Sequence, residues 1–334
     1  MIAKTAAKNT MEEIMRTGIA VAAALSLAAA RPACALEGGQ SVGDAAFGID
    51  GQSYFALPPP GGLWWINYLG ANNSNQIVDN HGNNALPGAK VSTQFNTFRI
   101  SWMPGLKLFG ADWAAFEVFP TYVHSEFRYK GQTTRVSGWG DLAIDPFGLA
   151  WKLANGTVGF STTFAVPTAS YDPTRSVNLG RNYATWMPQI FFTHYLEGNK
   201  GDFSAHFEYE YHFTNNRGQF SAVNPTGASY KSGQVIHAEI AYSRYLTQRW
   251  ALAGSVMASH QFTNDQIGDV ASNDVLQRVL DGNRYQNVAA GLSIRYLVAG
   301  VAPVTLTYDR DLYSRNKAKG QTLVLKGVIP LLGF

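Results

Sequence analysis

The sequence contains a single cysteine, Cys34, and it lies in an N-terminal segment that we expect to be removed. A chain with one cysteine forms no internal disulfide, so a disulfide-stapled fold is excluded. Charged residues are also scarce, at 15% of the 334 residues, whereas soluble domains have roughly 25%. Sparse charge predicts a protein whose outer surface does not mainly face water.

Long apolar runs are absent after residue 35, so we expect no transmembrane helix, which needs about 18 apolar residues in a row. The net charge is only +3 and no basic stripe is present, which argues against nucleic acid as a partner. The sequence contains no GxGxxG, HExxH or P-loop motif. We therefore predict that the protein is not an enzyme and uses no cofactor.

The N-terminus has the layout of a secretory signal peptide. Arg16 precedes an apolar run from Ile19 to Ala30, and Ala33-Cys-Ala35 matches an A-x-A cleavage site. We predict that residues 1–35 are removed on export. Residues 36–61, which are rich in Gly and Pro, should form an irregular N-terminal segment.

What the sequence has in abundance is alternation of apolar and polar residues. In Phe203–Thr214 the odd positions are apolar, five of the six being aromatic, and the even positions are all polar. Successive side chains of a β-strand point to opposite faces, so this segment is a strand with one aromatic face and one charged face. Similar runs recur about every 20 residues, between breaks rich in Gly, Asn and Asp. They lie near residues 62–70, 91–103, 112–128, 138–152, 156–168, 182–196, 202–214, 233–247, 249–263, 284–298, 302–314 and 320–334.

These runs predict an all-β fold: a transmembrane antiparallel β-barrel of about 12 strands formed by residues 62–334. A soluble β-sandwich would show the same alternation and is the alternative on pattern alone. The signal peptide, the aromatic ends of the apolar faces and the scarcity of charge favour a barrel in the outer membrane of a Gram-negative bacterium. We expect long loops near 71–90, 169–181, 215–232 and 264–283.

The chain ends in Phe334, a terminal residue that is typical of outer-membrane barrels. We therefore expect the barrel-assembly machinery to bind this end of the chain. Outer-membrane lipid is the second expected partner, because the aromatic faces of the strands would lie against it.

Several short motifs carry a family resemblance. They are Leu57-Pro-Pro-Pro-Gly-Gly-Leu63 with Asn67-Tyr68, Gly138-Trp-Gly-Asp-Leu142, Val166-Pro-Thr-Ala-Ser-Tyr-Asp-Pro173, Ser176-Val-Asn-Leu-Gly-Arg-Asn-Tyr183, Tyr230-Lys-Ser-Gly-Gln234 and Asp281-Gly-Asn-Arg284. Together they resemble the outer-membrane proteins described as "putative MetA-pathway of phenol degradation". The resemblance implies a channel for passive uptake of small hydrophobic or aromatic compounds, linked to aromatic (phenol meta-pathway) degradation, and it implies no catalytic residues. The alternative is a non-transporting outer-membrane barrel with a structural or lipid-related role.

The polar faces of the expected strands supply candidate residues for a solute path through the lumen. They are Arg99, Glu117, Asp145, His206, Glu208, Glu210, His212, His237, Glu239, Arg295 and Asp309. They either pair with one another as wall charges, or narrow the pore and set its selectivity. Because acids outnumber bases, neutral or cationic solutes should pass more readily than anions. Strong anion selectivity in planar bilayers would show that the faces are assigned wrongly.

The ladder from His206 to His212 could suggest a metal site. At about 3.3 Å per residue it spans about 20 Å, so one ion cannot contact both end residues. We therefore predict no metal site. A second candidate group, Asp172, Arg175 and Arg181, lies in a segment rich in turn formers. These residues either line a constriction or belong to a structural turn in which Asp172 caps the backbone.

Overall fold

The computed structural model describes residues 61–334 apart from 197, 199, 300–301 and 333–334. The predicted signal peptide, residues 36–60 and Phe334 lie outside the described residues. The elements are β1 (Gly62–Val78), β2 (Lys90–Met103), β3 (Trp113–Phe119), β4 (Thr121–Tyr129), β5 (Gln132–Trp139), β6 (Leu142–Leu153), β7 (Gly156–Val166), β8 (Thr185–Tyr195), β9 (Gly201–His212), β10 (Tyr230–Lys231), β11 (Val235–Tyr245), β12 (Trp250–Gln261), β13 (Gln266–Ile267), α2 (Val270–Val279), η2 (Asp281–Asn283), β14 (Gln286–Val298), β15 (Ala302–Arg315) and β16 (Lys317–Leu332). Neither helix of the described part is long and apolar enough to cross a membrane.

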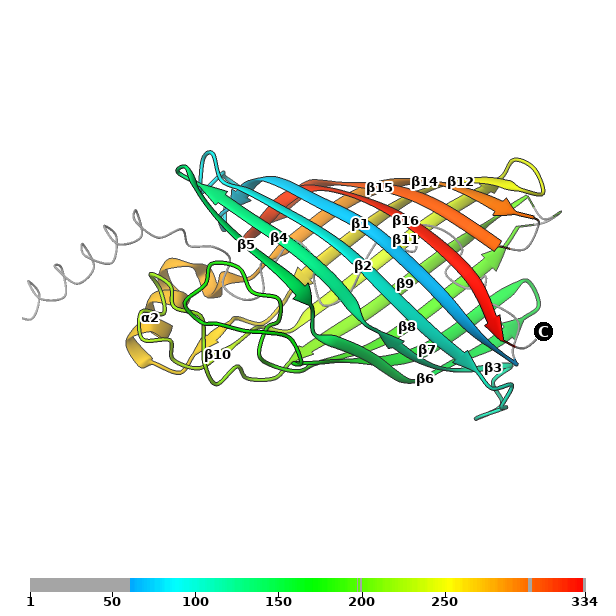
Figure 1. The fold of residues 1–334 in the computed structure, drawn as a ribbon, viewed down its shortest axis with the longest axis horizontal. Helices are drawn as coiled ribbons and strands as arrows, with labels where there is room; N and C mark the ends of the chain where they lie inside the picture. The colour runs from blue at the N-terminus through cyan, green and yellow to red at the C-terminus, as the bar shows by residue number, and fades with distance from the viewer. Residues whose placement is uncertain (1–60, 197, 199, 300–301, 333–334) are drawn as a thin grey trace, which may run out of the picture.

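Antiparallel pairing closes the main sheet into a barrel (Figure 1). The ring runs β1-β16-β15-β14-β12-β11-β9-β8-β7-β6-β3-β2 and closes where β2 pairs with β1. β4 continues the path of β3 beyond Pro120, and β5 and β6 are parts of one path that breaks at Gly140 and Asp141. The fourteen strands of this sheet, among the described residues, therefore form twelve wall strands. The predicted 12-stranded antiparallel barrel is confirmed.

The alternation in the sequence separates the outer face of the wall from the inner face. In β9, Phe203 and Phe207 are exposed on the outside, whereas Glu208 and Glu210 are buried on the inside. Large apolar side chains are likewise exposed on the other wall strands, including Ile240, Leu252, Val256, Leu292, Leu306 and Leu325. An apolar belt around a polar interior is the architecture of a transmembrane barrel of the bacterial outer membrane.

The two ends of the barrel differ. Figure 1 places the end of β16 at one end of the barrel and α2 with β10 at the other. At that second end, residues 213–234 and 262–285 form what we name the cap, held by pairing of β10 with β13 and by a cluster of Tyr230, Ile267 and Leu276. Bacterial barrels have short periplasmic turns and longer extracellular loops, so the cap marks the extracellular end.

Two of the expected loops were wrong in part. The loop expected near 71–90 is shorter, because β1 continues to Val78 and still pairs with β16 after a bulge between Ser74 and Gln76. Its outer face turns polar there, so the alternation fades although the hydrogen-bond ladder continues. The loop expected near 264–283 contains α2, whose N-terminus is capped by the Asp269 carboxylate, which accepts a bond from Ser272 N at 2.8 Å.

Candidate functional site

The inner faces of β9 and β11 hold six of the predicted lumen residues. His206, Glu208, Glu210, His212, His237 and Glu239 are all buried. The register of the two strands pairs His237 with Glu208 and Glu239 with His206. His206 also stacks on Phe191, with 4.5 Å between ring centroids, and its Nε2 lies 3.0 Å from Gln189 Oε1 on β8. Three neighbouring strands therefore build one polar wall, which we name the acid–histidine wall.

Glu210 lies between two histidines at the extracellular end of this wall. Its Oε1 is 3.2 Å from His237 Nε2, and its Oε2 is 3.2 Å from His212 Nε2. The opposite ring nitrogens are also engaged: His237 Nδ1 lies 2.7 Å from Ser259 Oγ, and His212 Nδ1 lies 2.8 Å from the carbonyl oxygen of Gly233. Because Gly233 belongs to the cap, His212 links the wall to the cap.

A second polar group joins β2, β3 and β6. The Arg99 guanidinium donates to Glu117 through Nε at 3.0 Å and Nη2 at 2.8 Å, and through Nη1 to Tyr68 Oη at 3.2 Å. Glu117 and Asp145 are register partners, and both are buried. Of the predicted residues, Arg99, Glu117 and Asp145 are thus brought together. Within this group Arg99 and Glu117 form an ion pair, whereas Glu117 and Asp145 are both acids.

The two remaining lumen predictions lie elsewhere on the wall. Arg295 on β14 places its guanidinium 5.2 Å from the ring centroid of Tyr245. Asp309 on β15 is buried beside Gly291, where an added Cβ would lie 1.9 Å from Asp309 Oδ1. Position 291 therefore has to be glycine for the Asp309 side chain to lie across β14.

The three predicted loop residues have different environments. Asp172 accepts bonds from Thr174 N at 2.9 Å and Thr174 Oγ1 at 2.7 Å, which lower the pKa of its carboxyl below the usual value, and it pairs with the exposed Arg175 at 3.5 Å. This is the geometry of the structural-turn alternative. Arg181, in contrast, is buried, and its Nη1 donates to Tyr183 Oη at 3.3 Å. Only Arg181 of the three is therefore buried within the fold.

Sequence reasoning missed several buried polar residues. Asp202 is buried at the start of β9 and accepts bonds from Tyr245 Oη at 2.6 Å and Ser243 Oγ at 3.2 Å. Asp202 occupies an even position on β9, and even positions of this strand face inward, so the alternation in the sequence could have identified it. Asp265 in the cap had no such signal, because no strand period covers it.

The segment Gly39-Gln-Ser-Val-Gly43 reads GxSxG, a spacing seen in hydrolases, and lies outside the described residues.

The opposite part of the inner wall carries two apolar clusters among buried polar residues such as Asn72, Thr93 and Ser125. On β1, β2 and β4 the buried residues include Ile66, Ile77, Phe95 and Phe127. Val177, from the segment between β7 and β8, packs against the cluster that contains Ile77 and Phe127. The segment 167–184 therefore lies against the second of these apolar clusters.

The strand pairing of the wall is interrupted next to this apolar cluster. β5 pairs with β4, but no strand among the described residues pairs with its other edge. β7 ends at Val166, opposite Leu142, so it stops where β5 would need a partner. The place is taken by segment 167–184, and we name this gap in strand pairing between β5 and segment 167–184 the seam.

Asp141 ties segment 167–184 to the barrel. Its carboxylate accepts bonds from Ala169 N at 3.0 Å and Arg181 N at 2.8 Å, near the two ends of the segment. At Gly138 an added Cβ would lie 2.8 Å from Leu179 Cδ1, so the segment also approaches β5 closely. The seam is thus closed by side chains and a few tethers rather than by a β-ladder.

Four prolines lie within or next to strands of this part of the wall. Pro120 separates β3 from β4, Pro146 lies within a register shift between Ile144 and Gly148, and Pro167 follows β7. At Pro188 the pairing of β8 with β9 lapses between Trp186 and Gln189. Proline has no backbone N–H to donate, so each of these positions weakens the ladder locally.

One family model and several solved structures match this chain. A family model described as "Putative MetA-pathway of phenol degradation" matches residues 74–327. The COG4313 outer membrane channel from Pseudomonas putida F1 has a similar structure, with a TM-score of 0.72 and 17% identity over 84% of this chain and 98% of that one. The translocator domain of autotransporter NalP from Neisseria meningitidis gives a TM-score of 0.48 and 10% identity over 84% of this chain and 91% of that one. No curated protein matches. Because the family model spans well over half of the sequence, the chain belongs to the family described as "Putative MetA-pathway of phenol degradation".

Proposed function

We propose that this protein is an outer-membrane channel for the passive uptake of small hydrophobic or aromatic compounds, in the setting of aromatic degradation that the family description names. The observation that carries the proposal is the seam, which lies beside the apolar cluster of Ile77, Leu86 and Phe127. An apolar molecule that enters the extracellular end can follow this lining without crossing the acid–histidine wall. An apolar molecule that passed the buried charges of that wall would form no hydrogen bonds with them to compensate for their lost contacts.

The outer side of the seam is aromatic. Trp139 at the end of β5 is 57% exposed and packs edge-on against Tyr122, with 5.5 Å between ring centroids. Phe98 lies 6.2 Å from the same indole ring. Aromatic rings of this kind favour the boundary between lipid and water. We infer that solutes leave the lumen through the seam and enter the membrane beside these rings.

Segment 167–184 would then control the exit. Its Val177 packs on the apolar cluster of Ile77 and Phe127. Its Arg181 is buried, and the backbone N–H of Arg181 donates to the Asp141 carboxylate. A small shift of the segment would open the seam while the twelve-stranded ring stays intact. The acid–histidine wall has a separate role in this proposal: it narrows the lumen on the side of β9 and β11 and repels anions.

Uptake of a growth substrate at limiting concentration tests the proposal. A strain that lacks the gene should take up a radiolabelled aromatic growth substrate several-fold more slowly than the complemented strain at micromolar concentration. The two strains should converge at saturating concentration, where slow permeation through lipid suffices. A deletion strain unimpaired on every low-concentration aromatic substrate would instead support a non-transporting barrel.

A further inference from the structure

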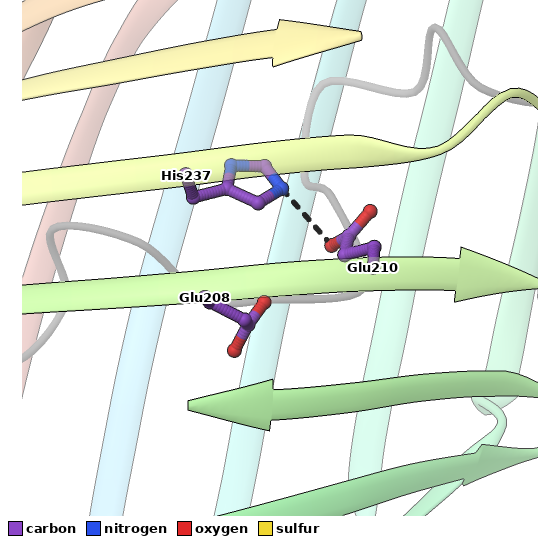
Figure 2. A group of neighbouring side chains, drawn as sticks. All are labelled: Glu208, Glu210 and His237. Atoms are coloured by element: carbon purple, nitrogen blue, oxygen red, sulfur yellow. Dashed lines mark ion pairs between the residues drawn. The ribbon is translucent and has the colours of Figure 1, made fainter. Parts of the chain in front are cut away.

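Three side chains of metal-binding type meet inside the barrel near its extracellular end. Glu208 and Glu210 come from β9 and His237 from β11, and one ligand atom of each lies within 4.8 Å of the others. Figure 2 shows the two carboxylates and the imidazole on adjacent strands, with the ion pair between His237 and Glu210 dashed. We propose that these residues bind a divalent transition-metal ion, for which Zn²⁺ is the probe of choice.

The donor set suits such an ion. Carboxylate oxygens and imidazole nitrogens bind Zn²⁺ at about 2.0–2.2 Å, and ligands of a tetrahedral ion are then about 3.3 Å apart. Glu210 Oε1 and His237 Nε2 are separated by 3.2 Å, so one ion can contact both with little movement. The ligand atoms of Glu208, Glu210 and His237 lie within 4.8 Å of one another, so a shift of the Glu208 carboxylate toward the ion completes the set.

The hydrogen bonds around the ligands orient them for an ion. Contact of His237 Nδ1 with Ser259 Oγ at 2.7 Å leaves Nε2 directed at Glu210. Metal-binding histidines usually engage their second nitrogen in this way, and it fixes the ring and the tautomer. His237 therefore has the surroundings of a ligand as well as the position.

His212 gives a second, independent pointer to a cation. Its Nδ1 donates to the Gly233 carbonyl at 2.8 Å, so in the neutral ring Nε2 carries a lone pair. That nitrogen lies 3.2 Å from Glu210 Oε2, which is also an acceptor. Such a contact is favourable when a proton, carried by the ring or by the carboxyl group, or a cation lies between the two atoms. His212 is thus a candidate fourth ligand.

Burial strengthens the case for a bound cation. Glu208, Glu210 and His237 are all at most 4% exposed, and Glu239 is buried on the next inward position of β11. Several carboxylates in a low-dielectric interior need compensating positive charge. An ion would supply two positive charges and would join β9 to β11, and His212 would extend that link to the cap through Gly233.

The sequence prediction of no metal site rested on the length of one strand. The distance argument holds for the ends of the ladder, from His206 to His212, but the ligands proposed here are neighbours across two strands. The inference does not depend on transport, because it concerns only ion binding to the folded barrel.

Isothermal titration of the full-length barrel in detergent, stripped with EDTA and titrated with Zn²⁺, tests the proposal. We expect one ion per chain for the wild type, and binding weaker by about 100-fold or more in Glu210→Gln and His237→Gln, since even outer-shell changes cost 10–100-fold. His260→Gln is the matched control, because His260 is an exposed histidine on the outer face of β12. It should bind Zn²⁺ like the wild type.

Folding of each variant is checked by its heat-modifiable migration in gels, and Glu208→Gln replaces any variant that does not fold. Wild-type protein that binds no Zn²⁺ would overturn the proposal and leave a protonated histidine–glutamate cluster as the account of this site. Folded Glu210→Gln or Glu208→Gln protein that binds Zn²⁺ as tightly as the His260→Gln control would overturn it too.

Discussion

Replacing Arg99 with alanine should destabilise the barrel by about 3–5 kcal/mol. Arg99 makes a bidentate pair with Glu117, which is only 7% exposed. Its removal leaves Glu117 buried without its cationic partner, next to its register partner Asp145. Two carboxylates in a poorly solvated wall repel each other, and neither can be fully hydrated. Denaturant unfolding in lipid vesicles, followed by tryptophan fluorescence, measures the loss.

The double variant Arg99→Met with Glu117→Gln is the matched control. It removes both charges and keeps the side-chain volumes, so it should cost much less than Arg99→Ala alone. If the free energy of unfolding of Arg99→Ala lies within about 0.5 kcal/mol of the wild-type value, Arg99 does not neutralise Glu117 in this wall. The stabilising role given to the pair is then wrong.

Replacing Asp265 with alanine should disorder the cap while leaving the barrel folded. The buried Asp265 carboxylate accepts bonds from Tyr230 Oη, from Gly233 N at 2.7 Å, and from the amides of Gln261 and Asn283 at 2.7 Å each. Alanine leaves these buried donors without an acceptor, at about 1–3 kcal/mol for each group. Limited proteolysis should then cut within 213–234 and 262–285, and intact cap segments in the variant would contradict this.

The same residue should give the cap a pH dependence. Burial raises the pKa of the Asp265 carboxyl above its usual 3.8, and the four hydrogen bonds only partly offset this effect. The folded cap therefore holds this proton to higher pH than the unfolded chain does. The resulting stabilisation is fully present below about pH 3.8 and is lost as the pH rises through the folded pKa. Proteolysis rates measured against pH should show this slope in the wild type and not in Asp265→Ala.

Alternation in the sequence was enough to predict the wall. The two-residue period decides which side chains face lipid and which face the lumen, so the inward positions of His206, Glu208, Glu210 and His212 follow from parity alone. The same parity on the next strand predicts His237 and Glu239. The extracellular end of β1 escaped this reasoning, because its outer face turns polar from Asn73 onward and the period fades.

Relations between strands could not be predicted in the same way. The contact of Glu210 with His237 depends on the register of β9 with β11, which the long connection between them leaves open. The seam depends on β7 ending at Val166 and on Asp141 binding both ends of segment 167–184, a tertiary arrangement without a sequence period. Asp265 likewise finds its four donors in separate parts of the chain.

Uptake through a barrel with a blocked seam tests the central claim most directly. At Gly140, a Cβ would make ordinary contacts, 3.5 Å from Thr121 O and 3.6 Å from Val123 Cγ2, with the Leu179 carbonyl oxygen 3.8 Å away. Gly140→Trp therefore places an indole in the seam. Leu292→Trp is the control, because it adds an indole on the outer face of β14, where Leu292 is 70% exposed.

The measurement is the initial rate of uptake of a neutral radiolabelled aromatic compound by cells, paired with ion conductance of the purified barrels in planar bilayers. Exit through the seam predicts that Gly140→Trp lowers uptake at least about tenfold, an effect of about 1.4 kcal/mol on the transport barrier, and leaves conductance unchanged. Leu292→Trp should match the wild type in both. Wild-type uptake by Gly140→Trp cells would contradict the lateral route.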